Sequence, residues 1–260
     1  MPRNDLALLI EAARRAGEIA APMQSGGDLG VSYKQEDGSP VTRADLAVND
    51  MLEHELRSAR PDYGWLSEES TANPSRLSAA RSFVIDPIDG TRTYIEGGKS
   101  WSHALAVVEG SEVIAAVVYL PKMACLYSAS AGGGALLNGQ RITVGARTAP
   151  EGADALATKP SMEPRFWPGG VPGLRPHHRP SLAYRLCLVA QGRFDAMITF
   201  RPSWEWDIAA GALIASEAGA RVTDTSGASL RFNQPHPQSD GVLSANPALH
   251  DALLQRMTLT

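Results

Sequence analysis

The sequence has few cysteines, no long apolar run and no basic run. Its two cysteines, Cys125 and Cys187, lie far apart and form no CxxC pair, which favours a reducing compartment. No apolar stretch approaches the roughly 20 residues that span a bilayer. Met1–Ala21 carries acidic residues where a secretory signal would be apolar. We therefore predict a cytoplasmic protein that has no membrane partner.

The chain also carries little net charge. Its 24 basic and 28 acidic residues leave a formal charge of −4, so the chain has no excess of positive charge to attract a nucleic-acid backbone. We therefore expect no nucleic-acid polymer as a partner. At 260 residues, with 43% hydrophobic and 20% charged residues, the chain has enough apolar material for a core in one large domain or two small ones.

One stretch differs from this ordinary background, because a β-prone run ends abruptly in acidic residues. The run Phe83–Ile85 is followed by the segment DPIDGT, Asp86–Thr91. Pro87 fixes its own φ and biases the residue before it toward an extended conformation, so we expect the strand to break there. Gly90 lets the backbone approach a ligand closely, and a short helix is predicted over Thr91–Glu96.

The chemistry of this turn suits a metal ion and a phosphate group. The carboxylates of Asp86 and Asp89 can hold a hard divalent cation. Free backbone N–H groups at the start of a helix face an anion. The turn therefore predicts a place where metal and phosphate meet.

Three other acidic positions each have an ordinary structural explanation. Asp45 lies where a carboxylate can complete a capping box with Thr42 at the start of a helix. Glu68 follows an expected short strand, in a loop where carboxylates are usually solvated. Asp207 opens a helix, where an acid in the first turn is favourable. Taken singly, none of the three indicates catalysis.

The chain as a whole is interpreted as an α+β unit, residues 1–147, followed by a smaller α/β unit, residues 148–260. In the first unit, helices are expected from Asn4 to about Ala21 and from Thr42 to Pro61, followed by an antiparallel sheet with strands at 64–70, 83–85, 102–108, 113–120, 123–129, 135–137 and 141–144. In the second unit, helices are expected at 181–191, 207–218 and 247–257, and strands at 194–200, 221–223 and 241–244. Residues 71–82 are expected to form a surface loop. Residues 145–180, with seven prolines and the pair His177-His178, are expected to form loops at a junction.

Several segments of the chain form a specific combination. They are Val41–Asp45, Ser67–Ser70, Asp86–Thr91, Gly134–Gly139, and Trp206–Ala210 with Glu217–Gly219. Together they resemble the inositol monophosphatase superfamily of metal-dependent, lithium-sensitive phosphatases, in the family's order and over nearly the whole chain. The family's GEES segment reads SEES here. The resemblance implies a layered αβαβα sandwich and a lithium-sensitive phosphatase activity.

The resemblance also implies two or three Mg²⁺ ions between the two units. Carried over by position, Glu68, Asp86 and the main-chain carbonyl of Ile88 would hold the first metal. Asp86 would bridge to a second metal, completed by Asp89 and Asp207. Oxygen ligands of this kind are what Mg²⁺ prefers, and two metals can stabilise both the attacking and the leaving oxygen of a displacement.

Asp45 and Thr91 match the family's pair that orients and deprotonates the attacking water. The N–H groups of Gly90 and Thr91, together with Asp207, are expected to contact the substrate. The implied reaction is direct attack of a metal-activated water on a small phosphate monoester, without a covalent phospho-enzyme.

Substrate choice is expected to depend on residues 181–206. The inositol-specific branch of the family carries a glutamate several residues before the WD aspartate, and this chain has no acid at Ile198–Arg201. Residues 201–207 look more like the PT-x-EWD segment of the 3′(2′),5′-bisphosphate nucleotidase branch. Arg185 falls where that branch often has a lysine, so Arg185 and Arg201 would face a second phosphate and Tyr184 would lie against a base. The alternative is an exposed helical arginine and a half-buried tyrosine.

The resemblance therefore favours hydrolysis of adenosine 3′,5′-bisphosphate to AMP and phosphate. An inositol-1-monophosphatase or a broad sugar-phosphate phosphatase is the alternative among enzymes. A non-catalytic homologue that binds metal and phosphate is the alternative from another class. The expected partner is a small phosphorylated metabolite. Many members of the family are homodimers, and the sequence leaves that state open for this chain.

Overall fold

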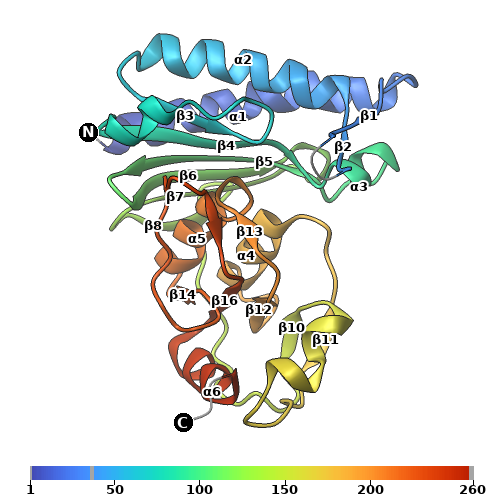
Figure 1. The fold of residues 1–260 in the computed structure, drawn as a ribbon, viewed down its shortest axis with the longest axis vertical. Helices are drawn as coiled ribbons and strands as arrows, with labels where there is room; N and C mark the ends of the chain where they lie inside the picture. Colours follow the sequence, from blue (N-terminus) through green and yellow to red (C-terminus); the bar gives the residue numbers. More distant parts are fainter. Residues whose placement is uncertain (1, 36–37, 258–260) are drawn as a thin grey trace.

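A computed structural model of the chain describes residues 2–35 and 38–257. Its helices are α1 (Pro2–Ser25), α2 (Arg43–Ala59), α3 (Thr91–Ile95), α4 (Leu182–Ala190), α5 (Glu205–Glu217) and α6 (Pro247–Met257). Figure 1 shows five layers: α1 with α2, a large sheet, α4 with α5, a second sheet, and α6. This is the predicted αβαβα sandwich. No helix in the described part of the chain is long and apolar enough to cross a membrane.

The large sheet has seven strands in the order β3-β4-β5-β6-β7-β8-β9. They are β3 (Gly64–Ser67), β4 (Arg81–Asp89), β5 (Ser102–Glu109), β6 (Glu112–Leu120), β7 (Cys125–Ser130), β8 (Gly134–Leu137) and β9 (Gln140–Arg141). All neighbours are antiparallel except β3 and β4, which are parallel. The predicted antiparallel sheet is therefore present, with one parallel edge strand that brings the end of β3 beside β4.

The second sheet has five strands in the order β11-β10-β12-β16-β14. They are β11 (Arg175–His177), β10 (Asp154–Leu156), β12 (Ala196–Thr199), β16 (Val242–Ala245) and β14 (Arg221–Thr223). Two pairs of short strands lie outside both sheets: β1 (Ser32–Tyr33) with β2 (Pro40–Val41), and β13 (Ser203–Trp204) with β15 (Gln238–Ser239).

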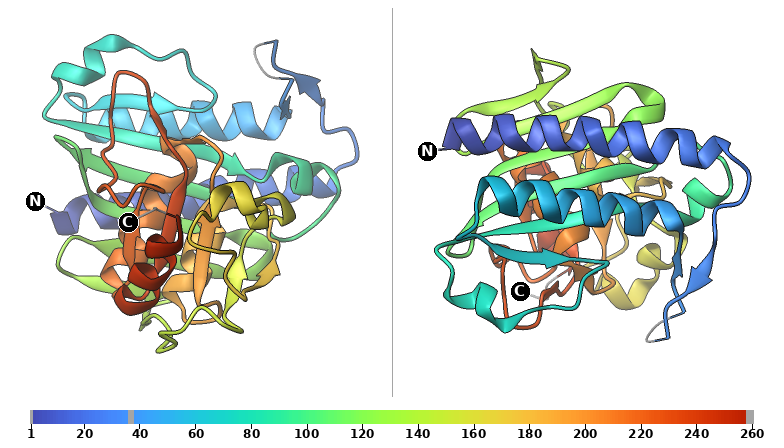
Figure 2. Two further views of the ribbon diagram at one scale, coloured as in Figure 1. Left: turned by 60° about the horizontal axis from the view of Figure 1, so that its bottom comes forward. Right: turned by 90° about the horizontal axis from the view of Figure 1, so that it is seen from above.

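The large sheet is buried on both faces, because successive side chains of a strand point to opposite sides. In β4, Phe83 and Ile85 pack in the core under α1 and α2, whereas Val84 packs in the core that contains α4 and α5. Figure 2 shows α1 and α2 side by side on this face of the sheet. Small side chains let α5 lie close to its neighbours. A Cβ on Gly211 would lie 2.8 Å from the Cβ of Leu186 in α4. This packing brings the first turn of α5 to the end of β4.

Several sequence predictions of local structure need correction. The helix α1 begins at Pro2, so Asn4 lies inside it, and α5 begins two residues before Asp207. Residues 71–82 are not only a surface loop, because the 3-10 helix η1 (Pro74–Ser78) buries Arg76 to 3% exposure. Residues 145–180 contribute β10 and β11 to the second sheet. The strand β11 tolerates Pro176 because it lies at the sheet edge.

Candidate metal and phosphate site

The acidic turn after Ile85 is a bulge within a strand. Asp86 pairs with Ala104 and Asp89 with Ser102, so β4 advances three residues while β5 advances two. The prediction that the strand ends at Asp86 is therefore wrong, because β4 continues to Asp89 with a local kink. The buried imidazole of His103 donates from Nδ1 to the Pro87 carbonyl and supports this kink.

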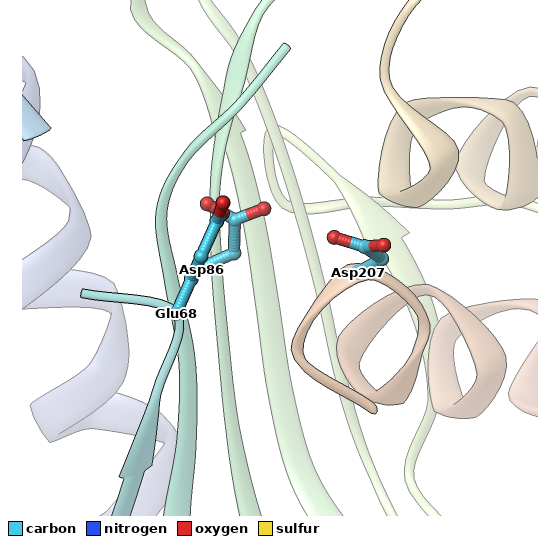
Figure 3. A group of neighbouring side chains, drawn as sticks. All are labelled: Glu68, Asp86 and Asp207. Atoms are coloured by element: carbon cyan, nitrogen blue, oxygen red, sulfur yellow. The ribbon is translucent and has the colours of Figure 1, made fainter. Parts of the chain in front are cut away.

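Three carboxylates from distant parts of the chain converge beside the bulge. One oxygen of each of Glu68, Asp86 and Asp207 lies within 4.8 Å of the others. Figure 3 shows Glu68 and Asp86 side by side, with Asp207 facing them from the first turn of α5. These are three of the predicted metal-ligating residues. They line a cavity of about 670 Å³, together with Ile88, Asp89, Gly90 and Thr91.

The donor set fits a hard divalent cation. Asp86 is 1% exposed, and its Oδ1 has no hydrogen-bond partner among the described residues. Burial, and then the neighbouring carboxylates, raise the pKa of Asp86 and of Asp207 well above the ordinary range. A buried acid that lacks a partner and lies beside other carboxylates, as Asp86 does, is unfavourable unless a cation joins them. The structure thus supplies the oxygen ligands that Mg²⁺ requires.

Asp89 joins β4 to α4 as well as lining the cavity. Its Oδ2 accepts hydrogen bonds from the Ser181 hydroxyl at 2.6 Å and from the Ala183 N–H at 2.8 Å. Burial raises its pKa to about 6 despite these bonds. The Ile88 carbonyl, predicted as a metal ligand, lies 3.1 Å from the Thr91 hydroxyl. Both predicted ligands therefore lie at the cavity beside Asp86.

Asp45 has both of the arrangements that the sequence left open. Its Oδ2 accepts from the N–H of Thr42 at 2.9 Å and from the Thr42 hydroxyl, which completes the capping box of α2. Its Oδ1 lies 3.2 Å from the Thr91 hydroxyl, which donates toward it. One carboxylate oxygen thus anchors the residue, and the other faces the predicted water-activating threonine. Burial raises the pKa of Asp45 to about 6.

Gly90 and Thr91 lie at the cavity where α3 begins. Gly90 has a φ of 101°, in the left-handed region that favours glycine. This conformation lets the chain leave the kinked strand and enter the helix within one residue.

Basic side chains line the same cavity as the acids. They are Arg92, His178, Arg185 and Arg201. Arg185 is 7% exposed, so the alternative of an exposed helical arginine is wrong. Its Nε donates to the Arg179 carbonyl, which holds the guanidinium in place.

The predicted substrate contact of Tyr184 is corrected by the structure. Tyr184 is 3% exposed and packs in the core, with its ring 6.4 Å from that of Tyr127. Consecutive residues of a helix point about 100° apart, so Arg185 faces the cavity while Tyr184 faces the large sheet. Tyr184 is therefore neither half-buried nor available to a base.

The comparisons with known proteins agree with this geometry. A model of the inositol monophosphatase family matches residues 1–258. The chain belongs to the inositol monophosphatase family. An inositol-1-monophosphatase of Rhizobium meliloti is 34% identical over 238 residues, 85% of this chain and 86% of the relative. The 3′(2′),5′-bisphosphate nucleotidase CysQ of Salmonella typhimurium is 30% identical over 227 residues, 85% of this chain and 90% of the relative. A solved structure of an IMPase from Thermotoga maritima has a TM-score of 0.83 at 29% identity and covers 99% of this chain and 97% of that one.

These findings support a phosphatase of the inositol monophosphatase family. The two relatives described above are named for different substrates, so the argument for one substrate rests on the side chains that line the cavity.

Sequence reasoning gave no role at this site to Lys34 or His178. Lys34 follows β1, and its Nζ lies 2.8 Å from an oxygen of Glu68 and 2.8 Å from an oxygen of Glu69. It stands in a polar link without a motif, so no sequence signal marks it. His178 lies in an exposed loop, as predicted, and it also lines the cavity.

The clustered acids should make the metal-free protein less stable as the pH rises. Burial raises the pKa of Asp45 and Asp89 from 3.8 to about 6 and that of Glu69 from 4.5 to about 7. The folded chain then binds more protons than the unfolded chain, so this stabilisation is present below the unfolded pKa values and is lost as the pH passes the folded ones. We expect the melting temperature in EDTA to fall between about pH 5 and about pH 7.5, and Mg²⁺ to raise it at the higher pH. A flat profile in EDTA would contradict this.

Proposed function

We propose that this protein is a Mg²⁺-dependent phosphomonoesterase that hydrolyses a small phosphate monoester. The supporting observation is the convergence of Glu68, Asp86 and Asp207 in a cavity that Thr91 also lines, with Asp45 in contact with the Thr91 hydroxyl. In this proposal the three acids, with Asp89 and the Ile88 carbonyl, hold two or three Mg²⁺ ions. Bound Mg²⁺ would supply charge stabilisation for the attacking and leaving oxygens of the phosphate.

The remaining residues of the cavity move a proton and hold the phosphate. The Thr91 hydroxyl orients a water molecule, and Asp45 Oδ1 takes the proton through it, since the two atoms lie 3.2 Å apart. A carboxylate with a pKa of about 6 suits a base that works near neutral pH. The N–H groups of Gly90 and Thr91 bind the phosphate oxygens.

The proposed substrate is adenosine 3′,5′-bisphosphate, which carries a second phosphate beyond the one removed. Arg185 and Arg201 line the same cavity as the acids, and neither forms an ion pair of 4.0 Å or less among the described residues. Two guanidinium groups that form no direct ion pair suit a phosphate, which they can bind through paired hydrogen bonds. Tyr184 lies in the core and has no part in holding the adenine base.

The test is a comparison of two substrates in Mg²⁺. We expect kcat/KM to be higher for adenosine 3′,5′-bisphosphate than for inositol 1-phosphate. A large preference for the inositol ester would overturn the proposed substrate and leave the proposed reaction intact, since both esters release phosphate by the same step.

Replacing Arg201 with glutamine tests whether this side chain binds the second phosphate of the substrate, the one that is not removed. A hydrogen bond to a charged group contributes about 1.5–3 kcal/mol, so we expect Arg201→Gln to lower kcat/KM for the bisphosphate by about 10-fold or more. The rate for inositol 1-phosphate should change little. Arg57→Gln is the matched control, because Arg57 is an exposed arginine of α2, paired with Glu53. Equal losses of kcat/KM on both substrates would show that Arg201 does not bind the second phosphate.

A further inference from the structure

We propose that Arg76 and Glu205 are positioning residues of the metal site. With Asn233 and Gln234 they form a clasp that holds the first turn of α5, and with it Asp207, against the side of the cavity that carries Glu68 and Asp86. This inference rests on the proposed function, because it concerns how the metal-binding acids are held together.

The first part of the clasp joins Glu205 to residues 233–237, the loop before β15. Glu205 is the first residue of α5 and is 1% exposed. Its two carboxylate oxygens accept the backbone N–H groups of Asn233, at 2.5 Å, and Gln234, at 2.9 Å. Its own N–H donates to the Pro237 carbonyl at 2.9 Å. The loop is therefore fastened to the start of the helix by three hydrogen bonds.

The second part joins the same loop to η1. Arg76 is 3% exposed, and its guanidinium donates to Asn233 Oδ1 at 2.5 Å and to the Gln234 carbonyl at 2.7 Å. The Asn233 amide in turn donates to the Arg76 carbonyl at 3.3 Å. In Figure 2 the loop before β15 reaches the segment around η1. A buried guanidinium is unfavourable unless such partners compensate for its lost water, so this contact specifies one arrangement of the two segments.

The clasp connects the two sides of the metal site from outside the cavity. Arg76 lies in the segment between Glu68, the residue after β3, and Asp86 in β4, whereas Glu205 lies two residues before Asp207. The three acids repel one another, and Asp207 approaches from a different layer of the fold. An outside contact that fixes α5 relative to η1 therefore opposes this repulsion. Groups that hydrogen-bond directly to metal ligands typically change metal affinity about 10–100-fold when they are replaced, and we expect the clasp, which acts through α5, to reach the lower end of that range.

Asn233→Gly is the sharpest variant for testing this. Asn233 has a φ of 58°, which glycine adopts readily, and the change removes both side-chain contacts with Arg76 while keeping the N–H that Glu205 accepts. Asn138→Gly is the matched control. Asn138 has a φ of 49° and also makes two side-chain hydrogen bonds to the backbone, but it lies in the β8–β9 turn at the opposite edge of the large sheet.

The affinity for Mn²⁺ is measured without substrate, with electron paramagnetic resonance as the detection method. Thermal unfolding of each variant is measured in parallel. We expect Asn233→Gly to weaken Mn²⁺ binding by about 10-fold, and Asn138→Gly to leave it within about twofold of wild type. Wild-type Mn²⁺ affinity in a folded Asn233→Gly protein, or an equal loss of affinity in both variants, would overturn the proposed role of the clasp. It would leave the proposed function intact. If the wild-type protein binds no Mn²⁺, the proposed function fails, and the clasp as a device of the metal site fails with it.

Discussion

Asp86→Asn is expected to lower kcat/KM for Mg²⁺-dependent phosphate release by about 10³-fold or more, because it removes the central charge that would hold the metal. The same change should raise the melting temperature of the metal-free protein near neutral pH. Asp86 is 1% exposed beside Glu68 and Asp207, and its Oδ1 has no hydrogen-bond partner among the described residues. A neutral amide relieves the repulsion and can donate to a neighbouring carboxylate.

These opposite effects on activity and stability distinguish a functional acid from a structural one. The measurements are initial rates of phosphate release in Mg²⁺ and thermal unfolding in EDTA. Asp50→Asn is the control, since Asp50 is an exposed acid of α2, and it should change neither quantity appreciably. Retention of most of the activity in Asp86→Asn would refute the metal assignment. A lower melting temperature in EDTA would refute the stated cause of the instability.

Asp45→Asn and Thr91→Val are each expected to lower kcat by about 10²–10⁴-fold while leaving Mn²⁺ binding close to wild type. Thr91→Val removes the hydroxyl that contacts Asp45 Oδ1, and Asp45→Asn removes the carboxylate that takes up the proton from water in this proposal. Because the two residues act as a unit, the double variant should lose little more than either single variant.

Thr42→Ala separates this role of Asp45 from its role in the capping box. Thr42 caps α2 and contacts only the other carboxylate oxygen of Asp45, so its loss should cost about 1 kcal/mol of stability and much less activity than Asp45→Asn. Unfolding in urea and initial rates measure the two effects. Similar kinetic losses in Thr42→Ala and Asp45→Asn would mean that Asp45 acts mainly by capping the helix.

The site could be predicted from sequence where its residues belong to short local patterns. Asp86 and Asp89 share one turn with Gly90 and Thr91, and Asp45 follows Thr42 at capping-box spacing. The contact between Asp45 and Thr91 spans 46 residues, and only the resemblance to a known family implied it before the structure placed the two side chains together. The layered fold followed in the same way from the order of motifs.

Other features depend on packing that no local pattern encodes. Arg76 looked like part of a polar surface loop because its partners, Asn233 and Gln234, lie more than 150 residues away. Tyr184 and Arg185 are adjacent in the sequence, and only the orientation of α4 between the two sheets decides which one reaches the cavity. Lys34 contacts Glu68 and Glu69 from a segment without a motif.

The most direct test of the proposed function is phosphate release by wild-type protein that has been freed of metal. We expect no release from adenosine 3′,5′-bisphosphate until Mg²⁺ is added, a rate that saturates with Mg²⁺, and a return to background with excess EDTA. An equal rate in EDTA, or no release in Mg²⁺ from either the bisphosphate or inositol 1-phosphate, would contradict it.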